Sequence, residues 1–443
     1  MSKYKYHLHN YHAIDSADIS IDGITVISGV NGSGKSTLSR WLYYLVNELA
    51  NYPYSVMEAF KKQLVHNIDM FLTVSREMYP GLSLFSSGEP RKSLRDARMN
   101  IQTKKLDDVD DLKGLIDIYS NVLRVFEDNL FQYLAKVTQG ARRERILSFL
   151  NIESTGDLKT DISMYSMKNA KLLQLQYKKI IDNIESRPKK IFFENIQRDF
   201  NVSEERPNNI QLKEDGVSLI KEDHISEFFN INKAIYIDTP MAISSNLEGD
   251  NTFWDSLREL MMTPISHPQT IEERSILIRL HKILNGTAKV TKTELGIKEL
   301  RYVNSDNTVN IKLEDAATGF KTFAYIQMLL ENGYLNDKTI LIIDEPEAHL
   351  HPQWIVEFAN ILVELNKKLG VKIVLASHNP DMVSAIKAIS VKKEISDNIH
   401  FYLSELNTDT KKYICKDLGQ DIEPIFESFN IALERINSYG EIL

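Results

Sequence analysis

The spacing of apolar residues separates strand-rich segments from a long helical stretch. Residues 4–37 are predicted to form short strands, whereas apolar positions recur at helical spacing from residue 38 to residue 190. Further strands are expected at 191–193, 210–220, 234–238, 300–303, 309–313 and 399–403. Shorter helical segments are expected at 251–284 and 422–436.

Residues 315–377 alternate between helix and strand, which is typical of the βαβ units of a parallel sheet. The pattern therefore predicts an α/β fold with a mixed or parallel sheet, whose first strands are separated from the others by a long helical insertion. The predicted domains are a head of residues 1–40, 191–250 and 285–443, a helical insertion at 41–190, and a second, short helical insertion at 251–284.

A phosphate-binding sequence, G-x-x-x-x-G-K-S, occupies residues 29–36, between an apolar strand and a helical run. Its glycines let backbone N–H groups converge on a phosphate, and the helix N-terminus adds partial positive charge. Lys35 is predicted to reach the β- and γ-phosphates of ATP, and we expect no reason for its burial without nucleotide. Ser36 is predicted to bind Mg²⁺. The residues predicted to contact ATP here are Asn31, Gly32, Ser33, Gly34, Lys35, Ser36 and Thr37.

An apolar strand at 339–343 ends in two carboxylates, Asp344 and Glu345, in the Walker B form. Asp344 is predicted to hold Mg²⁺, and Glu345 to polarise the water that attacks the γ-phosphate. Standing alone, this segment would be read as a buried strand that ends in surface acids. The phosphate-binding sequence favours the functional interpretation.

Another apolar strand, at 371–377, ends next to His378, which is placed to touch a γ-phosphate. The alternative interpretation of His378 is a polar surface residue at a strand end. His349 and His351 lie beside Glu345 and Glu347 in the sequence, but they lack the i, i+4 spacing of helical zinc sites. Metal binding by these two histidines is therefore disfavoured.

A helix is predicted to start at Thr318 and Gly319 and to run to about residue 330. Its first backbone N–H groups and its positive dipole end can bind an anion. The chain thus carries, in order, a phosphate loop, a Thr-Gly helix start, an Asp-Glu strand end and a Ser-His strand end.

This order of motifs resembles the ABC-type ATPases, and more narrowly their branch of SMC, RecF and overcoming-lysogenisation-defect (OLD) proteins. The phrase Ile-Asp-Glu-Pro-Glu-Ala-His-Leu-His-Pro at 343–352 is similar to stand-alone bacterial ATPases of Septu-type and PARIS-type antiphage defence. The resemblance implies a P-loop ABC-ATPase head. It also implies that Thr318, Gly319 and Lys321 contact ATP across a dimer, that 348–351 form the D-loop, and that His378 is the switch histidine.

Two positions depart from that pattern. The signature here reads Ala-Thr-Gly-Phe-Lys in place of Leu-Ser-Gly-Gly-Gln, and no glutamine follows 236–240, where the Q-loop is expected.

Composition limits the partners and the compartment. A net charge of −8 excludes attraction of nucleic acid by the whole molecule, so any such contact needs a local patch. The single cysteine, Cys415, excludes an intrachain disulfide, and no apolar run reaches the roughly 20 residues of a membrane span. We expect a cytoplasmic protein without membrane contact.

Basic clusters at 91–98, 142–145 and 178–190 make nucleic-acid contact possible, and an acidic run at 107–111 is expected to be a solvated face or a docking surface.

The predicted function is that of an ATP-hydrolysing switch, acting as a homodimer or higher oligomer through composite ATP sites. It would control a separate effector, a nuclease or toxin, in bacterial antiphage defence. The 65 residues after His378 leave no room for a nuclease domain, so no nuclease activity is expected from the chain itself. The alternative is a RecF-like DNA-repair ATPase that acts directly on DNA, and a transporter subunit is disfavoured.

Overall fold

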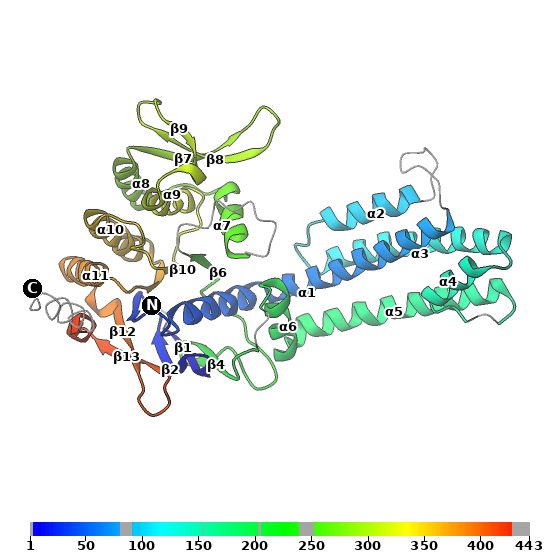
Figure 1. Ribbon diagram of the computed structural model, residues 1–443, viewed down its shortest axis with the longest axis horizontal. Coiled ribbons are helices and arrows are strands. Elements are labelled where there is room, and N and C mark those ends of the chain that lie inside the picture. Colours follow the sequence, from blue (N-terminus) through cyan, green and yellow to red (C-terminus); the bar gives the residue numbers. More distant parts are fainter. Residues whose placement is uncertain (1–2, 80–90, 154, 203–204, 239–251, 428–443) are drawn as a thin grey trace, which may run out of the picture. The chain divides into compact units, whose positions relative to one another are not determined.

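The computed structural model describes residues 3–79, 91–153, 155–202, 205–238 and 252–427 (Figure 1). Its internal contacts divide the chain into two compact units. The first consists of Met1–Ala50 and Phe192–Leu443, and the second of Asn51–Ile191. Among the described residues, no helix has the length and apolar character needed to cross a bilayer.

The first unit is built on a mixed sheet, in which ten described strands follow the order β5-β4-β1-β2-β13-β12-β3-β11-β10-β6. The strands are β1 Tyr4–Tyr11, β2 Ile14–Ser20, β3 Ile24–Gly29, β4 Asn209–Glu214, β5 Val217–Ser218, β6 Lys233–Ile237, β10 Thr339–Asp344, β11 Lys372–Ala376, β12 Ile399–Leu406 and β13 Tyr413–Gly419. Five neighbours, β12, β3, β11, β10 and β6, run parallel, whereas the β1–β2 and β1–β4 pairs are antiparallel. The predicted α/β fold with a mixed sheet is confirmed.

The central strands β3, β10 and β11 are buried along their whole length. Continuous apolar runs of this kind suit parallel strands that are covered on both faces. Side chains of the helices extend the same core, including Leu280, Phe323, Phe358 and Ile386. Helix α6 (Lys189–Asp199) begins in the second unit and continues in the first from Phe192. The later helices of the first unit are α7 Thr252–Met262, α8 Ile271–Leu284, α9 Thr318–Glu331, α10 Pro352–Leu369 and α11 Pro380–Lys392, with short 3₁₀ turns at Leu313–Asp315 and Ser396–Asn398.

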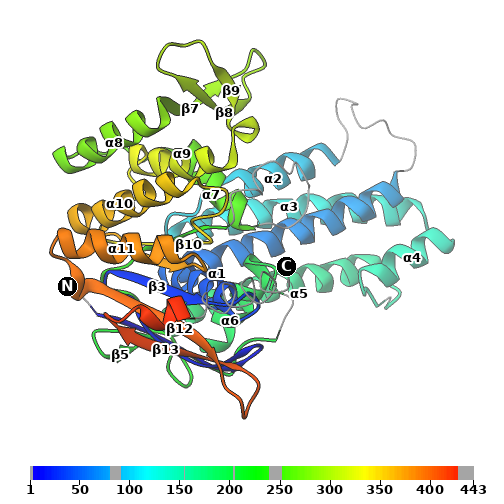
Figure 2. The same cartoon turned by 60° about the vertical axis from the view of Figure 1, so that its left-hand side comes forward.

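Helices α10 and α11 pack side by side in both views (Figures 1 and 2). A separate three-stranded sheet, in the order β7-β8-β9, lies next to α8 and α9. Its strands are β7 Gly286–Lys292, β8 Lys298–Asn304 and β9 Asn310–Lys312.

The second unit is helical and has a core of its own. Helix α1 (Lys35–Met78) enters it at Asn51, where the backbone leaves helical geometry, two residues before Pro53. A proline inside a helix removes one backbone hydrogen bond and clashes with the preceding turn, which explains the kink. The other helices are α2 Arg91–Thr103, α3 Asp110–Lys136, α4 Ala141–Phe149 and α5 Leu158–Ser186. Phe60, Phe71, Leu115 and Phe126 lie in the core between them.

Some predicted elements differ from the structure. The strand expected at 191–193 is wrong, because these residues belong to α6, where Phe192, Phe193 and Ile196 share one buried face. The helical stretch at 251–284 is two helices, α7 and α8, and its first residue lies outside the described residues. Strands β7 and β13 were not expected. Most of the helix predicted at 422–436 also lies outside the described residues.

Candidate nucleotide site

The phosphate loop connects the end of β3 to the start of α1. Gly34 has φ +90°, and a Cβ atom there would lie 2.7 Å from Cγ1 of Ile14 on β2. Any other residue would therefore meet both backbone strain and a steric clash. Asn31 and Gly32 are exposed, Ser33 is buried, and Ser36 and Thr37 are half-buried at the start of the helix.

The Lys35 side chain is folded over the loop. Its Nζ donates hydrogen bonds to the carbonyl oxygens of Gly29 (2.8 Å) and Val30 (2.9 Å), and only 7 % of the residue is exposed. The expectation that Lys35 has no reason for burial without nucleotide is wrong, because the loop carbonyls supply acceptors for the ammonium. Burial lowers the pKa of Lys35, while the charges of Asp344, Glu345 and Glu347 act in the opposite direction.

These acids lie near the lysine because of the strand register. Asp344 on β10 is level with Ala376 on β11, and Ala376 is level with Ile27 on β3. The three parallel strands therefore end at the same edge of the sheet, which is the usual position of ligand sites in open α/β sheets. Ser377 continues this alignment, since its N–H donates to the carbonyl of Ile27 at 3.0 Å.

Asp344 is 4 % exposed, and the Tyr236 hydroxyl on β6 donates to its Oδ2 at 3.2 Å. Its Oδ1 is buried and has no hydrogen-bond partner among the described residues. Burial raises the pKa of Asp344, while the hydroxyl groups of Ser36 and Tyr236 act to lower it. A buried carboxylate oxygen without a partner, next to a serine hydroxyl, suits the oxygen coordination that Mg²⁺ prefers.

Glu345 follows the strand with a left-handed backbone, at φ +49°. Its N–H donates to the carbonyl of Ala376 at 2.8 Å, which fixes the turn against β11. Its side chain is 38 % exposed and lies 3.8 Å from Nδ1 of His378. Non-glycine residues with this backbone are uncommon, and they cluster at functional sites.

Glu347 connects the two strand ends, although no role was predicted for it from the sequence. Its carboxylate accepts hydrogen bonds from the Ser377 hydroxyl (2.9 Å) and from the His378 N–H (3.0 Å). The same carboxylate lies 3.3 Å from Nδ1 of His378. Glu347 is 5 % exposed, and burial raises its pKa. Its position two residues after Glu345 was the only signal in the sequence, because the contacts cross from one strand end to the next.

The predicted signature residues start α9 at Thr318. A Cβ atom on Gly319 would lie 2.9 Å from the carbonyl oxygen of His349, so this helix start packs against the predicted D-loop. The ammonium of Lys321 donates to the carbonyl of Glu314 at 2.5 Å, and 6 % of the residue is exposed. The contacts described for Gly319 and Lys321 are therefore with other segments of the first unit, and not with the phosphate loop.

His351 is the N-cap of α10, where its ring nitrogen accepts from the Gln353 N–H at 3.4 Å. Neither His349 nor His351 belongs to a converging group of three metal-ligand side chains in the described part of the chain. The predicted Q-loop position follows β6, and residues 239–251 lie outside the described residues. Just before them, Asp238 lies 3.5 Å from the guanidinium of Arg40.

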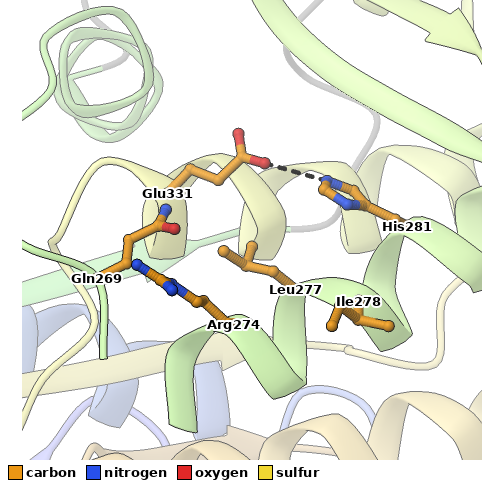
Figure 3. A pocket seen from close by; sticks show the side chains of 6 residues that line it. All are labelled: Gln269, Arg274, Leu277, Ile278, His281 and Glu331. Atoms are coloured by element: carbon orange, nitrogen blue, oxygen red, sulfur yellow. Dashed lines mark hydrogen bonds and ion pairs between the residues drawn. The ribbon is translucent and has the colours of Figure 1, made fainter. Parts of the chain in front are cut away.

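A separate cavity of about 510 Å³ lies against α8 and α9 (Figure 3). His281 and Glu331 form a 3.1 Å pair at its side, and the buried amide of Gln327 donates to Glu331 at 2.9 Å. The backbone N–H of Ala288 on β7 donates to the same amide. These contacts join α8, α9 and β7, and they give His281, Gln327 and Glu331 partners within the protein.

Some residues of the predicted basic clusters and of the acidic run form ion pairs or hydrogen bonds inside the second unit. Arg98 pairs with Asp69, and Arg145 pairs with Glu77. In the acidic run, the carboxylate of Asp111 accepts the backbone N–H groups of residues 107 and 108 at the start of α3. Carboxylates at a helix N-terminus satisfy unpaired N–H groups and the helix dipole.

Comparison with known proteins shows the family to which this chain belongs. The model of the AAA ATPase domain matches residues 4–383. The chain is 24 % identical over 399 residues to the retron Vc95 probable ATPase of Vibrio cholerae, covering 83 % of this chain and 68 % of that protein. It is also 36 % identical over 72 residues to the energy-coupling factor transporter ATP-binding protein EcfA3 of Clostridium perfringens. That match covers 16 % of this chain and a quarter (25 %) of the transporter protein.

Among solved structures, the Smc head bound to the C-winged helix domain of ScpA aligns with 94 % of this chain and 97 % of its own. Its TM-score is 0.34 at 11 % identity. The family model and the curated relatives confirm the resemblance to ATPases. The chain belongs to the AAA ATPase domain family.

Proposed function

We propose that this chain binds ATP with Mg²⁺ at the edge where β3, β10 and β11 end, hydrolyses it there, and works as a nucleotide-dependent switch. The observation that carries the proposal is the convergence of Lys35, Asp344 and Glu345 from separate segments of the chain. A cation and carboxylates that share one buried edge suit phosphoryl transfer, because catalysis there depends on positioning and on charge stabilisation.

In this proposal the loop N–H groups and Lys35 bind the phosphates. The ammonium exchanges its bonds to Gly29 and Val30 for phosphate oxygens, which are stronger acceptors because they are charged. Ser36 and Asp344 hold Mg²⁺, which would neutralise charge on the β- and γ-phosphates.

Glu345 orients the attacking water and accepts its proton, and His378 contacts the γ-phosphate. Both side chains are partly exposed on the same side of the site, 38 % and 43 % respectively. Glu347 is the positioning residue, because its buried carboxylate ties the His378 backbone and ring to the Walker B turn.

Two chains would complete each site. The start of α9 offers N–H groups from Thr318 and Gly319. A two-fold dimer would place this helix start against the phosphates held by the other subunit. The contacts of Gly319 with His349 would then couple the helix start to the D-loop of its own chain.

The switch would act on a separate effector, a nuclease or toxin, in antiphage defence. This part of the proposal is supported by the similarity to a retron-associated probable ATPase over most of the chain. Asp344 and Glu345 are assigned to ATP, Glu347 to the positioning of His378, and Asp238 lies 3.5 Å from the guanidinium of Arg40, so no nuclease activity is expected from the chain itself.

The test uses Lys35→Ala and Glu345→Gln. The controls are Lys338→Ala, at an exposed position, and Glu357→Gln, at a half-exposed surface position. Lys35→Ala should weaken ATP binding by about 10–100-fold, because it removes the charge-assisted hydrogen bonds between the ammonium and the phosphates. Glu345→Gln should bind ATP but slow hydrolysis by roughly 10²-fold or more. It should also accumulate as a dimer in ATP, measured by light scattering.

Both controls should keep wild-type turnover. If folded Lys35→Ala hydrolyses ATP at nearly the wild-type rate, the proposed role of this site in ATP hydrolysis is refuted. If the Glu345→Gln protein stays monomeric in ATP, the proposed dimer is contradicted.

A further inference from the structure

Two histidines and a carboxylate meet on the solvent side of the β1–β2 hairpin, in a place that the nucleotide chemistry does not use. His7 and His9 are two residues apart on β1, so their side chains leave the same face of the sheet. Asp18 on β2 is directly opposite His7 in the register. Leu8, the one residue between them, points into the core instead.

The three side chains converge on one oxygen. Oδ1 of Asp18 contacts Nδ1 of His7 and lies 3.0 Å from Nε2 of His9. The two ring nitrogens and this oxygen all lie within 4.8 Å of one another. A zinc ion about 2.0–2.2 Å from each ligand would separate neighbouring ligand atoms by roughly 3.3 Å in a tetrahedron. The side chains of His9 and Asp18 are the more exposed members of the cluster and would rotate to reach that spacing.

The donor set selects the kind of metal. Imidazole nitrogens suit Zn²⁺ and neighbouring transition metals, whereas Mg²⁺ prefers oxygen ligands. The side chain of Asp18 is 56 % exposed and that of His9 is 43 % exposed, so water can fill the remaining coordination positions. The site is thus distinct in chemistry from the oxygen ligands proposed for the nucleotide-bound Mg²⁺.

We propose that His7, His9 and Asp18 form a binding site for a zinc-type divalent cation that clamps β1 to β2. The clamp acts on the hairpin whose second strand begins at Ile14, the residue that packs against Gly34 of the phosphate loop. The bound ion therefore stabilises one wall of that loop.

The test is calorimetric titration of Zn²⁺ into the untagged full chain, after treatment with a chelator and without nucleotide. Wild type should bind one equivalent at this site. His7→Gln, His9→Gln and Asp18→Asn should each weaken that binding at least tenfold, since even outer-sphere partners of a metal typically contribute 10–100-fold. His224→Gln changes an exposed histidine outside the cluster and should bind as wild type does. Millimolar Mg²⁺ should not compete.

Thermal unfolding separates loss of the site from loss of the fold. Zn²⁺ should raise the melting temperature of wild type and of His224→Gln, and it should leave that of His9→Gln unchanged. Equal Zn²⁺ affinity in wild type, His9→Gln and Asp18→Asn would overturn the proposal. So would the absence of Zn²⁺ binding by wild type, and the cluster would then be an ion pair only.

Discussion

Replacement of Glu347 tests whether the link between the two strand ends controls hydrolysis. The Glu347→Ala change removes the acceptor of the Ser377 hydroxyl and of the His378 N–H, together with the 3.3 Å pair with the histidine ring. Each buried donor left without an acceptor costs about 1–3 kcal/mol. Relief from burying a carboxylate offsets part of that cost. The free energy of unfolding should therefore fall by about 2–4 kcal/mol.

Glu347→Gln is the milder variant, because the amide oxygen still accepts one hydrogen bond while its NH₂ group faces the other donor. Its expected cost is about 1–2 kcal/mol. The control is Glu357→Gln, which alters a half-exposed pair with Arg279 on the surface. Such pairs contribute about 0–1 kcal/mol. Urea denaturation, measured on all three variants, gives these differences.

Hydrolysis should respond more strongly than ATP binding. With His378 and the Walker B turn no longer tied together, kcat of Glu347→Ala should fall by roughly 10–100-fold, as expected when a positioned group is displaced by about 1 Å. ATP affinity should change less than kcat, because the described hydrogen bonds of the Glu347 carboxylate go to Ser377 and His378 and not to the phosphate loop. A folded Glu347→Ala protein with wild-type kcat would refute the positioning role.

The pH dependence gives a second readout. Burial raises the pKa of Glu347, so the folded protein binds this proton more tightly than the unfolded chain does. The free energy of unfolding consequently falls as pH rises from the unfolded pKa, about 4.3, through the raised folded pKa. Glu347→Gln removes this titration, so stability above about pH 4.3 should decline less steeply than in wild type.

The remaining predictions concern the glycines of the phosphate loop and the single cysteine. Gly34→Ala and Gly32→Ala share the strain of a positive φ, about 1–2 kcal/mol, but only Gly34→Ala adds a clash with Ile14, for about 1–3 kcal/mol more. Gly34→Ala should have a lower melting temperature and weaker ATP binding than Gly32→Ala. Equal effects of the two changes would contradict the predicted clash with Ile14. Burial raises the pKa of Cys415 to about 12, so iodoacetamide at pH 8 should label the denatured chain quickly and the native chain hardly at all. Rapid labelling of the native protein would show that this strand opens.

The sequence alone predicted those features that depend on a few neighbouring residues. The phosphate loop is one such segment, because its glycines, lysine and helix start lie within eight residues. The buried strands β3, β10 and β11 are another, because continuous apolar runs need cover on both faces. The helix at 189–199 was missed, because three apolar residues in a row fit either a strand or the buried face of a helix.

Contacts between distant segments were decided by the tertiary structure. Lys35 and Asp344 are 309 residues apart, and only the parallel register of β3, β11 and β10 brings their strand ends to one edge. The role of Glu347 depends on Ser377 and His378 at the end of the neighbouring strand. The His7, His9 and Asp18 cluster likewise depends on the pairing of β1 with β2. The sequence determines which residues carry the chemistry, whereas strand order and register set which of them meet, because these depend on long-range pairing that no local pattern encodes.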